Sequence, residues 1–462
     1  MDNELEKRYG FPHALSMVVG IVTGCGIFFK ASKGLEVLGG SMLECLLAMI
    51  LVGLICLVCS YLFALLASKY VKCIGIIDYS NVSVGPRYSY FVGWFLSVMY
   101  YPVISSMMCY MAAKYTCLLL GFSAYGTEHT IIAFVYLLLC IFVNSISPRI
   151  AGRIQILTTI IKLMPIFALA IGGTYIGIKN GNGLNIFTDT SAKDLVEENS
   201  IFTAICAFVF IFEGWGIATS INSELKNPKR DLPKALMIGT IFCIIIYLLY
   251  TYSLGATLTA EEIVSAGYWL PQIAFTNLFH NNLAGVIVYV FIVISCLGAA
   301  NGIVFAGMRS FYALAIRNQG PNPKEVARFN HKTKMPTKSC ILGGVMALFW
   351  LFQCSILYYN GPLVMDRTGL PVWLMGWEAD ELVIMLMYLF YIPIFAHIFK
   401  AEEDFNFFQR YILSIIGIAC SIFIFISTII AYGASMVLSF LATFAIIMGL
   451  GAFFYRKDPA IK

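Results

Sequence analysis

The chain has 462 residues, of which 60% are hydrophobic and only 12% are charged. This composition is typical of an integral membrane protein and excludes a soluble globular core. The formal net charge of +5 says little as a sum, because the distribution of Lys and Arg along a membrane protein is what sets its orientation.

Hydrophobic segments long enough to cross a bilayer, for which ~20 apolar residues suffice, recur along the whole chain. Twelve spans are predicted, at 12–32, 41–67, 91–120, 130–147, 154–178, 200–224, 235–257, 283–316, 339–357, 380–399, 411–431 and 433–454. Two long connections, 259–282 and 358–379, are expected to hold short helices. No connection is large enough for a soluble domain, so residues 1–462 are interpreted as one membrane domain.

Basic residues favour cytoplasmic loops, and with the N-terminus inside the cell most of the 30 Lys and Arg residues fall on the cytoplasmic side. The sequence therefore predicts a multi-pass protein of the cell membrane with both termini in the cytoplasm. The basic run Lys332–Lys338 is interpreted as part of this topology signal. No nucleic-acid partner is expected; the expected surroundings are the lipid bilayer.

The 14 cysteines lie mostly within apolar segments, where they fit small buried hydrophobic residues better than a disulfide framework. The five histidines are scattered along the chain. We therefore predict no metal site, no cofactor and no catalytic residues. A membrane enzyme would need a clustered catalytic set within the spans, and the sequence suggests none.

Two spans are interrupted near their centres by glycines and polar residues. The first span contains the stretch Val22-Thr23-Gly24-Cys25-Gly26-Ile27-Phe28, and the sixth contains Phe212-Glu213-Gly214-Trp215-Gly216. Glycine weakens a helix, and irregular backbone at membrane depth is tolerated only where it faces protein or a watery cavity. The sequence therefore predicts a broken helix in each span. The alternative is that these glycines only let neighbouring helices pack closely.

Each interrupted span opens a group of five spans, so the second group enters the membrane from the opposite side. This predicts a first inverted repeat at 1–178, a second at 200–399, and two additional helices at 411–454. Interrupted helices in corresponding positions of two inverted halves are typical of a transporter substrate site. The site would lie where the two breaks meet.

The ends of the broken helices indicate the chemistry of the ligand. A half-helix that begins near Gly26 leaves the amides of Gly26, Ile27 and Phe28 without intrahelical partners, which suits a carboxylate. A half-helix that ends near Val22 leaves carbonyls that suit an ammonium group. A carboxylate and an ammonium about two bonds apart describe an α-amino acid.

Three stretches resemble the amino acid–polyamine–organocation (APC) superfamily. Thr23–Phe28 is similar to its G-S-G-I-F motif, with Cys25 where the family more often has Ser. Glu224–Ala235 is similar to its E-x-x-N-P-x-R-x-[IL]-P-x-A signature. Gly298–Arg309, with the pair Asn301-Gly302, resembles the L-type amino acid transporter branch.

The resemblance covers nearly the whole chain. It implies an all-α membrane protein with twelve transmembrane helices, a five-plus-five inverted repeat of the LeuT type with helices 1 and 6 broken, and two extra C-terminal helices. It also implies import or exchange of amino acids by alternating access. The substrate-binding residues expected on this basis are Val22, Thr23, Gly24, Cys25, Gly26, Ile27, Phe210, Phe212, Glu213, Gly214 and Asn301. Among these, Phe210 corresponds by resemblance to the aromatic gate over the substrate.

A lysine within the fifth span, Lys162, is the strongest candidate for a coupling residue, because a cation at membrane depth is costly and usually has a function. The resemblance implies that it replaces a bound sodium ion, with Ser295 and the carbonyls near Val19 and Gly20 as partners. This predicts sodium-independent transport. The alternative is a lysine that extends to the inner surface.

Glu213 lies inside the second break, where relatives mostly carry an apolar or small residue. It would pair with a cationic substrate side chain or carry a coupling proton. The alternatives are a cap on the second half-helix or a pair with another buried cation. Lys30 and Glu44 also lie in or near spans and are assigned no role.

The resulting hypothesis is a secondary active amino acid transporter, either a sodium-independent exchanger or a proton-coupled symporter, for cationic or neutral substrates. The alternative is an amino-acid-binding sensor on the same fold. In eukaryotic members of the L-type branch, a cysteine in the loop after span 3 pairs with a second subunit. The corresponding loop here, Gly121–Thr130, has no cysteine. We therefore expect a monomer or homodimer and no disulfide-linked subunit.

Overall fold

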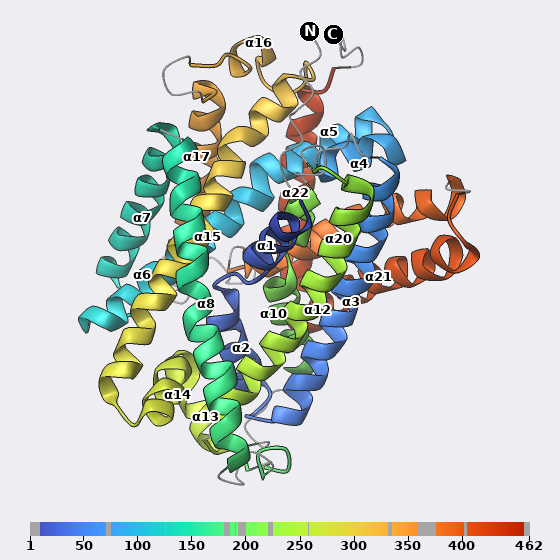
Figure 1. Cartoon of the computed structure of the whole chain (residues 1–462). Coiled ribbons are helices and arrows are strands. Elements are labelled where there is room, and N and C mark those ends of the chain that lie inside the picture. Colours follow the sequence, from blue (N-terminus) through green and yellow to red (C-terminus); the bar gives the residue numbers. More distant parts are fainter. Residues whose placement is uncertain are drawn as a thin grey trace. The chain divides into compact units, whose positions relative to one another are not determined.

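The computed structural model describes residues 10–70, 75–124, 126–146, 148–179, 185–189, 191–192, 200–219, 225–256, 258–330, 335–358, 376–401 and 404–456. These residues are helical or form short connections, and Asn330 and Met335 form an isolated β-bridge (Figure 1). This confirms the predicted all-α membrane fold.

Ten helical segments of the described residues are long and apolar enough to cross a membrane. They are Met42–Lys69, Pro86–Leu120, Thr127–Ile146, Leu157–Lys179, Pro228–Gly255, Asn282–Ala315, Thr337–Ser355, Ala379–Lys400, Phe408–Tyr432 and Ala434–Phe453. Phe11–Gly20 and Ser200–Phe212 are apolar but shorter. These two overlap the predicted spans 12–32 and 200–224, which are the spans expected to break.

The chain forms two compact units, each assembled from separate stretches of sequence. Unit 1 comprises residues 1–89, 163–285 and 384–431. Its helices are α1 (Phe11–Val22), α2 (Gly26–Val37), α3 (Met42–Lys69), α4 (Ile76–Ser83), the later part of α8 (Pro148–Lys179), α10 (Ser200–Phe212), α11 (Trp215–Ala218), α12 (Pro228–Gly255), α13 (Ala260–Ala266), α14 (Leu270–Phe279), most of α20 (Ala379–Ala401) and α21 (Leu413–Tyr432). The division into inverted repeats at 1–178 and 200–399 stays a prediction.

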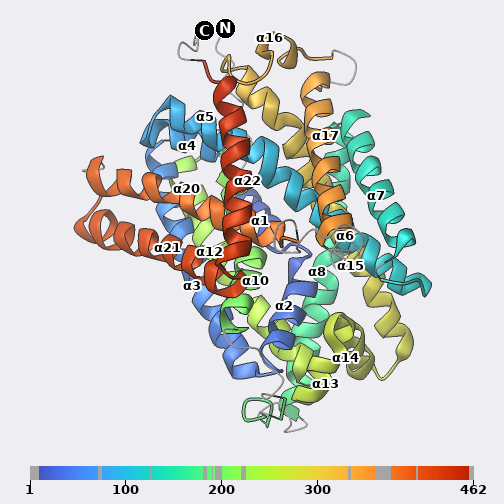
Figure 2. The ribbon, with the colours of Figure 1, turned by 180° about the vertical axis from the view of Figure 1, so that it is seen from behind.

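Unit 2 comprises residues 90–162, 286–383 and 432–462. It contains most of α5 (Pro86–Phe95), α6 (Tyr101–Leu120), α7 (Thr127–Ile146), the start of α8, most of α15 (Asn282–Ala315), α16 (Pro323–Val326), α17 (Thr337–Phe352) and α22 (Ala434–Phe453). A π-helical turn, Leu96–Tyr100, joins α5 to α6. Helices α6, α7, α15 and α17 are neighbours in this unit (Figure 2).

Small residues let the helices of unit 1 approach closely, as is common in membranes. A Cβ at Gly53 of α3 would lie 2.8 Å from Ile244 of α12, and one at Gly239 of α12 would lie 2.6 Å from Val18 of α1. Helix α12 therefore packs on both α3 and α1, which fixes the position of the half-helix that leads into the first break.

The connection 259–282 holds the short helices that the sequence predicts. Helix α13 begins with a capping box, in which Thr259 and Glu262 satisfy each other's backbone amides. Helix α14 follows after a 3₁₀ turn, Gly267–Trp269, and α2 contacts both helices. The other connection expected to hold short helices, 358–379, lies almost wholly outside the described residues.

Candidate functional site: two adjacent helix breaks

The first span is broken where the sequence predicts. Helix α1 ends at Val22, the residues Thr23 to Cys25 form a non-helical link, and α2 begins at Gly26 (Figure 1). The Thr23 amide and hydroxyl both donate to the Val19 carbonyl, which closes the end of α1. The Gly24 amide donates to the Val22 carbonyl at 2.6 Å. The link is therefore a compact turn held by its own backbone and by Thr23.

The start of α2 presents fewer open amides than the three we expected. The Phe28 amide donates to the Cys25 carbonyl at 3.1 Å, so it is engaged in the first turn. The Gly26 and Ile27 amides have no hydrogen-bond acceptor among the residues that the structure describes. These two donors stand at the positive end of the α2 dipole, where a carboxylate is favoured.

The second break follows α10 directly. Helix α10 ends at Phe212, Glu213 and Gly214 form a turn, and α11 begins at Trp215. Gly214 has φ of +106°, a conformation that side-chain-bearing residues rarely adopt, so the glycine permits the turn. Trp215 is fully buried, and within the described part of the chain its indole N–H has no acceptor.

Both breaks lie in unit 1, and each half-helix of one span packs against a half-helix of the other. Helix α2 packs against α10, and α1 packs against α11. Gly26 is where the breaks meet, because a Cβ there would lie 2.8 Å from the Phe210 ring and 3.3 Å from Ile211. The half-helix after one break thus lies on the half-helix before the other, as two antiparallel broken spans require.

Tyr247 of α12 connects the two breaks. Its hydroxyl donates to the Val22 carbonyl at 2.7 Å, and its ring lies 5.2 Å from the Phe212 ring. Tyr247 is fully buried. It therefore holds the last residue of α1 beside the last residue of α10. The sequence analysis missed this residue, and no local pattern identifies it because its partners are distant in sequence.

The Glu213 side chain is directed toward α20 and α3. The Tyr391 hydroxyl of α20 donates to Glu213 Oε1 at a long 3.5 Å. The Tyr391 ring packs on Tyr388 of α20, with centroids 5.3 Å apart, and Tyr388 lies against Cys56 of α3. Cys56 and Tyr388 are themselves hydrogen-bonded at 3.1 Å. The second break therefore places an ionisable group against a hydroxyl and thiol cluster, which is a different chemistry from the first break.

Tyr391 also belongs to an aromatic cluster. Phe63 of α3 contacts the rings of Tyr79, Trp215, Tyr391 and Phe395, with centroids 5.0 to 5.9 Å apart. Such edge-to-face contacts favour a fixed arrangement of rings. Trp215, which follows the turn at Glu213, is thus packed in a well-ordered aromatic cluster.

Lys30 is another charged residue of the site, and the sequence analysis gave it no role. It lies on α2 and is only 2% exposed, with its Nζ 4.9 Å from the centroid of the Phe210 ring. The sequence signal was visible, since a lysine stands in an apolar segment. What the sequence does not reveal is that the lysine contacts the predicted gate residue.

The predicted coupling pair, Lys162 and Ser295, lies in unit 2, and both side chains are buried. A Cβ at Gly298 of α15 would lie 2.3 Å from Thr158 of α8, so the two helices touch one turn away from Lys162 and Ser295. Val19 and Gly20 belong to unit 1. The coupling role of Lys162 stays a prediction.

Asn301 was expected to bind substrate, and its side chain is held by a neighbouring helix. The Asn144 amide of α7 donates to Asn301 Oδ1 at 3.0 Å and to the Asn301 carbonyl at 3.2 Å. Asn301 is 4% exposed. This contact joins α7 to α15 within unit 2, and a substrate contact by Asn301 stays a prediction.

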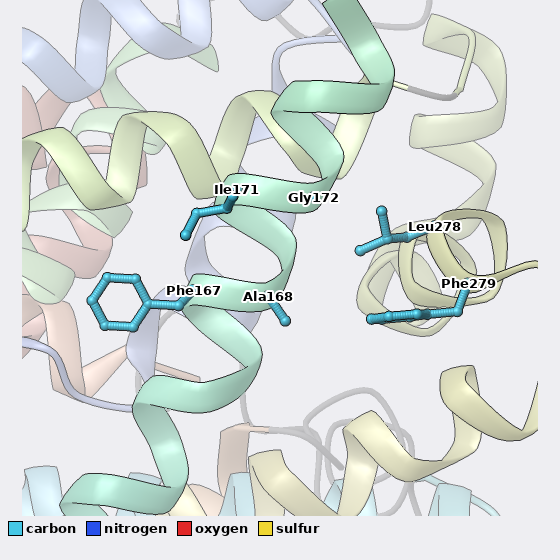
Figure 3. A pocket seen from close by; sticks show the side chains of 6 residues that line it. All are labelled: Phe167, Ala168, Ile171, Gly172, Leu278 and Phe279. Atoms are coloured by element: carbon cyan, nitrogen blue, oxygen red, sulfur yellow. The ribbon is translucent and has the colours of Figure 1, made fainter. Parts of the chain in front are cut away.

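A separate pocket of about 390 Å³ lies between α8 and α14, also in unit 1 (Figure 3). It is lined by Phe167, Ala168, Ile171, Gly172, Leu278 and Phe279. These side chains offer no polar group for a carboxylate or an ammonium, so the pocket does not suit an amino acid. Among the described residues no group of three or more His, Cys, Asp and Glu is arranged to hold a metal ion.

Paired broken helices within a multi-pass helical protein define the class of secondary transporters with discontinuous spans. The fold agrees, because the chain is similar to the solved structure of MhsT in complex with L-phenylalanine, with a TM-score of 0.59, 16% identity, and coverage of 91% of this chain and 99% of that one. Residues 9–453 match the family model described as amino acid permease, and the chain belongs to that family.

Named relatives agree with this family. The chain is 28% identical to the serine/threonine exchanger SteT of Bacillus subtilis, over 99% of this chain and 98% of that protein. It is 25% identical to the human b(0,+)-type amino acid transporter 1, over 76% of this chain and 71% of that protein. These relatives are transporters rather than enzymes.

Proposed function

We propose that this protein moves α-amino acids across the membrane by alternating access, as a sodium-independent exchanger. The observation that carries the proposal is the meeting of two helix breaks at Gly26 and Phe210, with Tyr247 bonded to one break and packed on the other. The Gly26 and Ile27 amides supply donors for the substrate carboxylate. The carbonyl end of α1 lies on the other side of the link and suits the ammonium.

Exchange is favoured over other modes by the relative that the chain matches along almost its whole length, which is a serine/threonine exchanger. Proton-coupled symport is the second candidate, and the observation that favours it is Glu213 beside the Tyr391 hydroxyl. A carboxyl group at membrane depth is suited to carry a proton between the two sides. An amino acid sensor on the same fold would bind substrate without moving it.

The proposal includes orientation and assembly. The protein lies in the cell membrane with both termini in the cytoplasm; the distribution of basic residues supports this orientation. The chain works as a monomer or homodimer without a disulfide-linked subunit. In support of this, the loop 121–130 contains no cysteine.

The test is transport by the purified chain alone in proteoliposomes. We expect labelled serine or another α-amino acid to enter vesicles that contain unlabelled amino acid, with the same rate in sodium and in potassium buffer. Uptake into empty vesicles that requires an inward proton gradient would support the symporter. Binding detected by thermal shift without any uptake would indicate a sensor and contradict both transport modes.

We propose that Lys162 replaces a bound sodium ion, and substitution of Lys162 tests this role. Lys162→Ala is expected to lose most turnover, because the buried ammonium that would take the place of the sodium ion is removed. Lys162→Arg should retain part of it, since the charge remains. Full uptake by the Lys162→Ala variant in proteoliposomes would rule out this role.

A further inference from the structure

The contact between Lys30 and Phe210 is the feature of the site that the transport mechanism above does not use. Lys30 stands four residues after Gly26 on α2, so the two residues share one face of the helix. Its side chain is 2% exposed, and its ammonium lies over the Phe210 ring. A buried lysine within a membrane span is costly and therefore calls for a functional explanation.

The Phe210 ring is held from two sides by the same helix. Gly26 leaves the space for it, since a Cβ at Gly26 would lie 2.8 Å from its edge. Lys30 lies 4.9 Å from its centroid, within the distance at which a cation is attracted to an aromatic face. Phe29 adds a ring 6.0 Å away. The predicted gate residue is thus fixed between the first break and a buried charge.

The same charge changes the electrostatics of the site. The open amides at Gly26 and Ile27 already form the positive end of a helix dipole, and the Lys30 ammonium lies one turn further along α2. A substrate carboxylate is attracted by both. A second positive charge on a substrate side chain that reaches Phe210 is repelled, and weak dielectric screening inside the membrane strengthens this effect.

We propose that Lys30 is a specificity-determining residue: it positions the Phe210 ring and excludes substrates that carry a second positive charge. The substrate class is then α-amino acids with neutral or acidic side chains, and dibasic amino acids are discriminated against. This inference rests on the proposed function, because it assumes an α-amino acid at the two breaks. It decides between the neutral and cationic substrates that the sequence left open.

The experiment is competition in proteoliposomes that contain the full chain. Exchange of labelled serine is measured against unlabelled serine, threonine, leucine and glutamate, and against arginine, lysine and ornithine. We expect wild-type protein to prefer the neutral substrates over the dibasic ones by about tenfold or more. In Lys30→Met, which keeps the apolar stem and removes the charge, this ratio should fall to within about threefold. Lys30→Arg should keep it.

A matched control is available in Lys114→Met, because Lys114 on α6 is also a buried lysine, 6% exposed, and lies in unit 2. This variant should leave the ratio unchanged. If Lys30 had only a structural role, Lys30→Met would lower the exchange rates of all substrates together. The ratio between neutral and dibasic substrates would then stay unchanged. The ratio is therefore the readout that separates specificity from folding.

Wild-type protein that exchanges arginine as well as serine would overturn the inference, and so would an unchanged ratio in Lys30→Met. If Lys30→Met fails to fold, the wild-type ratio and Lys30→Gln decide in the same way. Failure of the proposed function looks different, since no amino acid of any class would then be exchanged.

Discussion

The two helix breaks of unit 1 have the same architecture and different chemistry. The link between α1 and α2 contains no ionisable acid or base other than the Cys25 thiol, and it is closed by Thr23 and by backbone hydrogen bonds. The turn between α10 and α11 carries Glu213, requires the positive φ of Gly214, and leads into the buried Trp215. The second break therefore carries an ionisable carboxyl group, and the first does not.

This difference suggests a division of labour. On the proposed function, backbone amides and carbonyls at the first break would bind the carboxylate and the ammonium group that every α-amino acid shares. The ionisable carboxyl at the second break would instead carry a proton during the transport cycle. Substitutions at the first break should therefore alter binding of all substrates alike, and those at the second should alter coupling.

The largest expected effect comes from Gly26, where the breaks touch. In Gly26→Val the new Cβ would lie 2.8 Å from the Phe210 ring, which Lys30 and Phe29 hold in place. We expect exchange of every substrate to be lost and stability to fall by ~1–3 kcal/mol, the usual cost of overpacking. The control is Gly449→Val, since a Cβ at this exposed glycine of α22 meets no atom within 4 Å. Normal exchange by Gly26→Val would contradict the contact between the breaks.

The next effect is expected from Glu213→Gln, which keeps the shape and the contact with Tyr391 and removes the ionisable group. If Glu213 carries a proton, wild-type uptake rises as the external pH falls, and the variant loses this dependence. The measurement is the initial rate of uptake across about pH 5 to 8. Tyr391→Phe, which removes the hydroxyl donor at 3.5 Å, should shift the same profile by less. An unchanged pH profile in Glu213→Gln would instead indicate that Glu213 caps the second half-helix. The two breaks would then not differ in their role in coupling.

The sequence predicts the positions of both breaks because the signal is local: glycines and polar residues interrupt long apolar segments. It does not predict what holds the breaks together. Tyr247 and Val22 are 225 residues apart, and Tyr391 and Glu213 are 178 apart. Such pairs depend on how the helices pack, which periodicity along one helix does not encode. The same reason hides the contact of Asn144 with Asn301, because each residue alone fits an ordinary helix.

A smaller effect is expected from Tyr247→Phe, which tests the connection between the breaks. The substitution removes the 2.7 Å hydrogen bond to the Val22 carbonyl and keeps the ring contact with Phe212. The Val22 carbonyl retains the Gly24 amide, so it is not left without a donor. We expect a loss of ~0.5–1.5 kcal/mol in stability and a moderate rise in KM for all substrates. Thermal unfolding and uptake kinetics check this, and a change confined to one substrate would contradict it.

The smallest effect is expected from Cys25→Ser, which introduces the serine of the G-S-G-I-F motif that this stretch resembles. A serine hydroxyl is a better hydrogen-bond donor than a thiol and is a preferred residue at the start of a helix. However, the φ of −73° and ψ of −13° at Cys25 differ from the extended backbone usual at the start of a helix, and its side chain makes no capping bond. The amides of Gly26 and Ile27, not the side chain, then hold the substrate carboxylate. Affinity should change by no more than about threefold, which corresponds to ~0.65 kcal/mol. A tenfold gain would show that a side chain governs recognition at the first break as well.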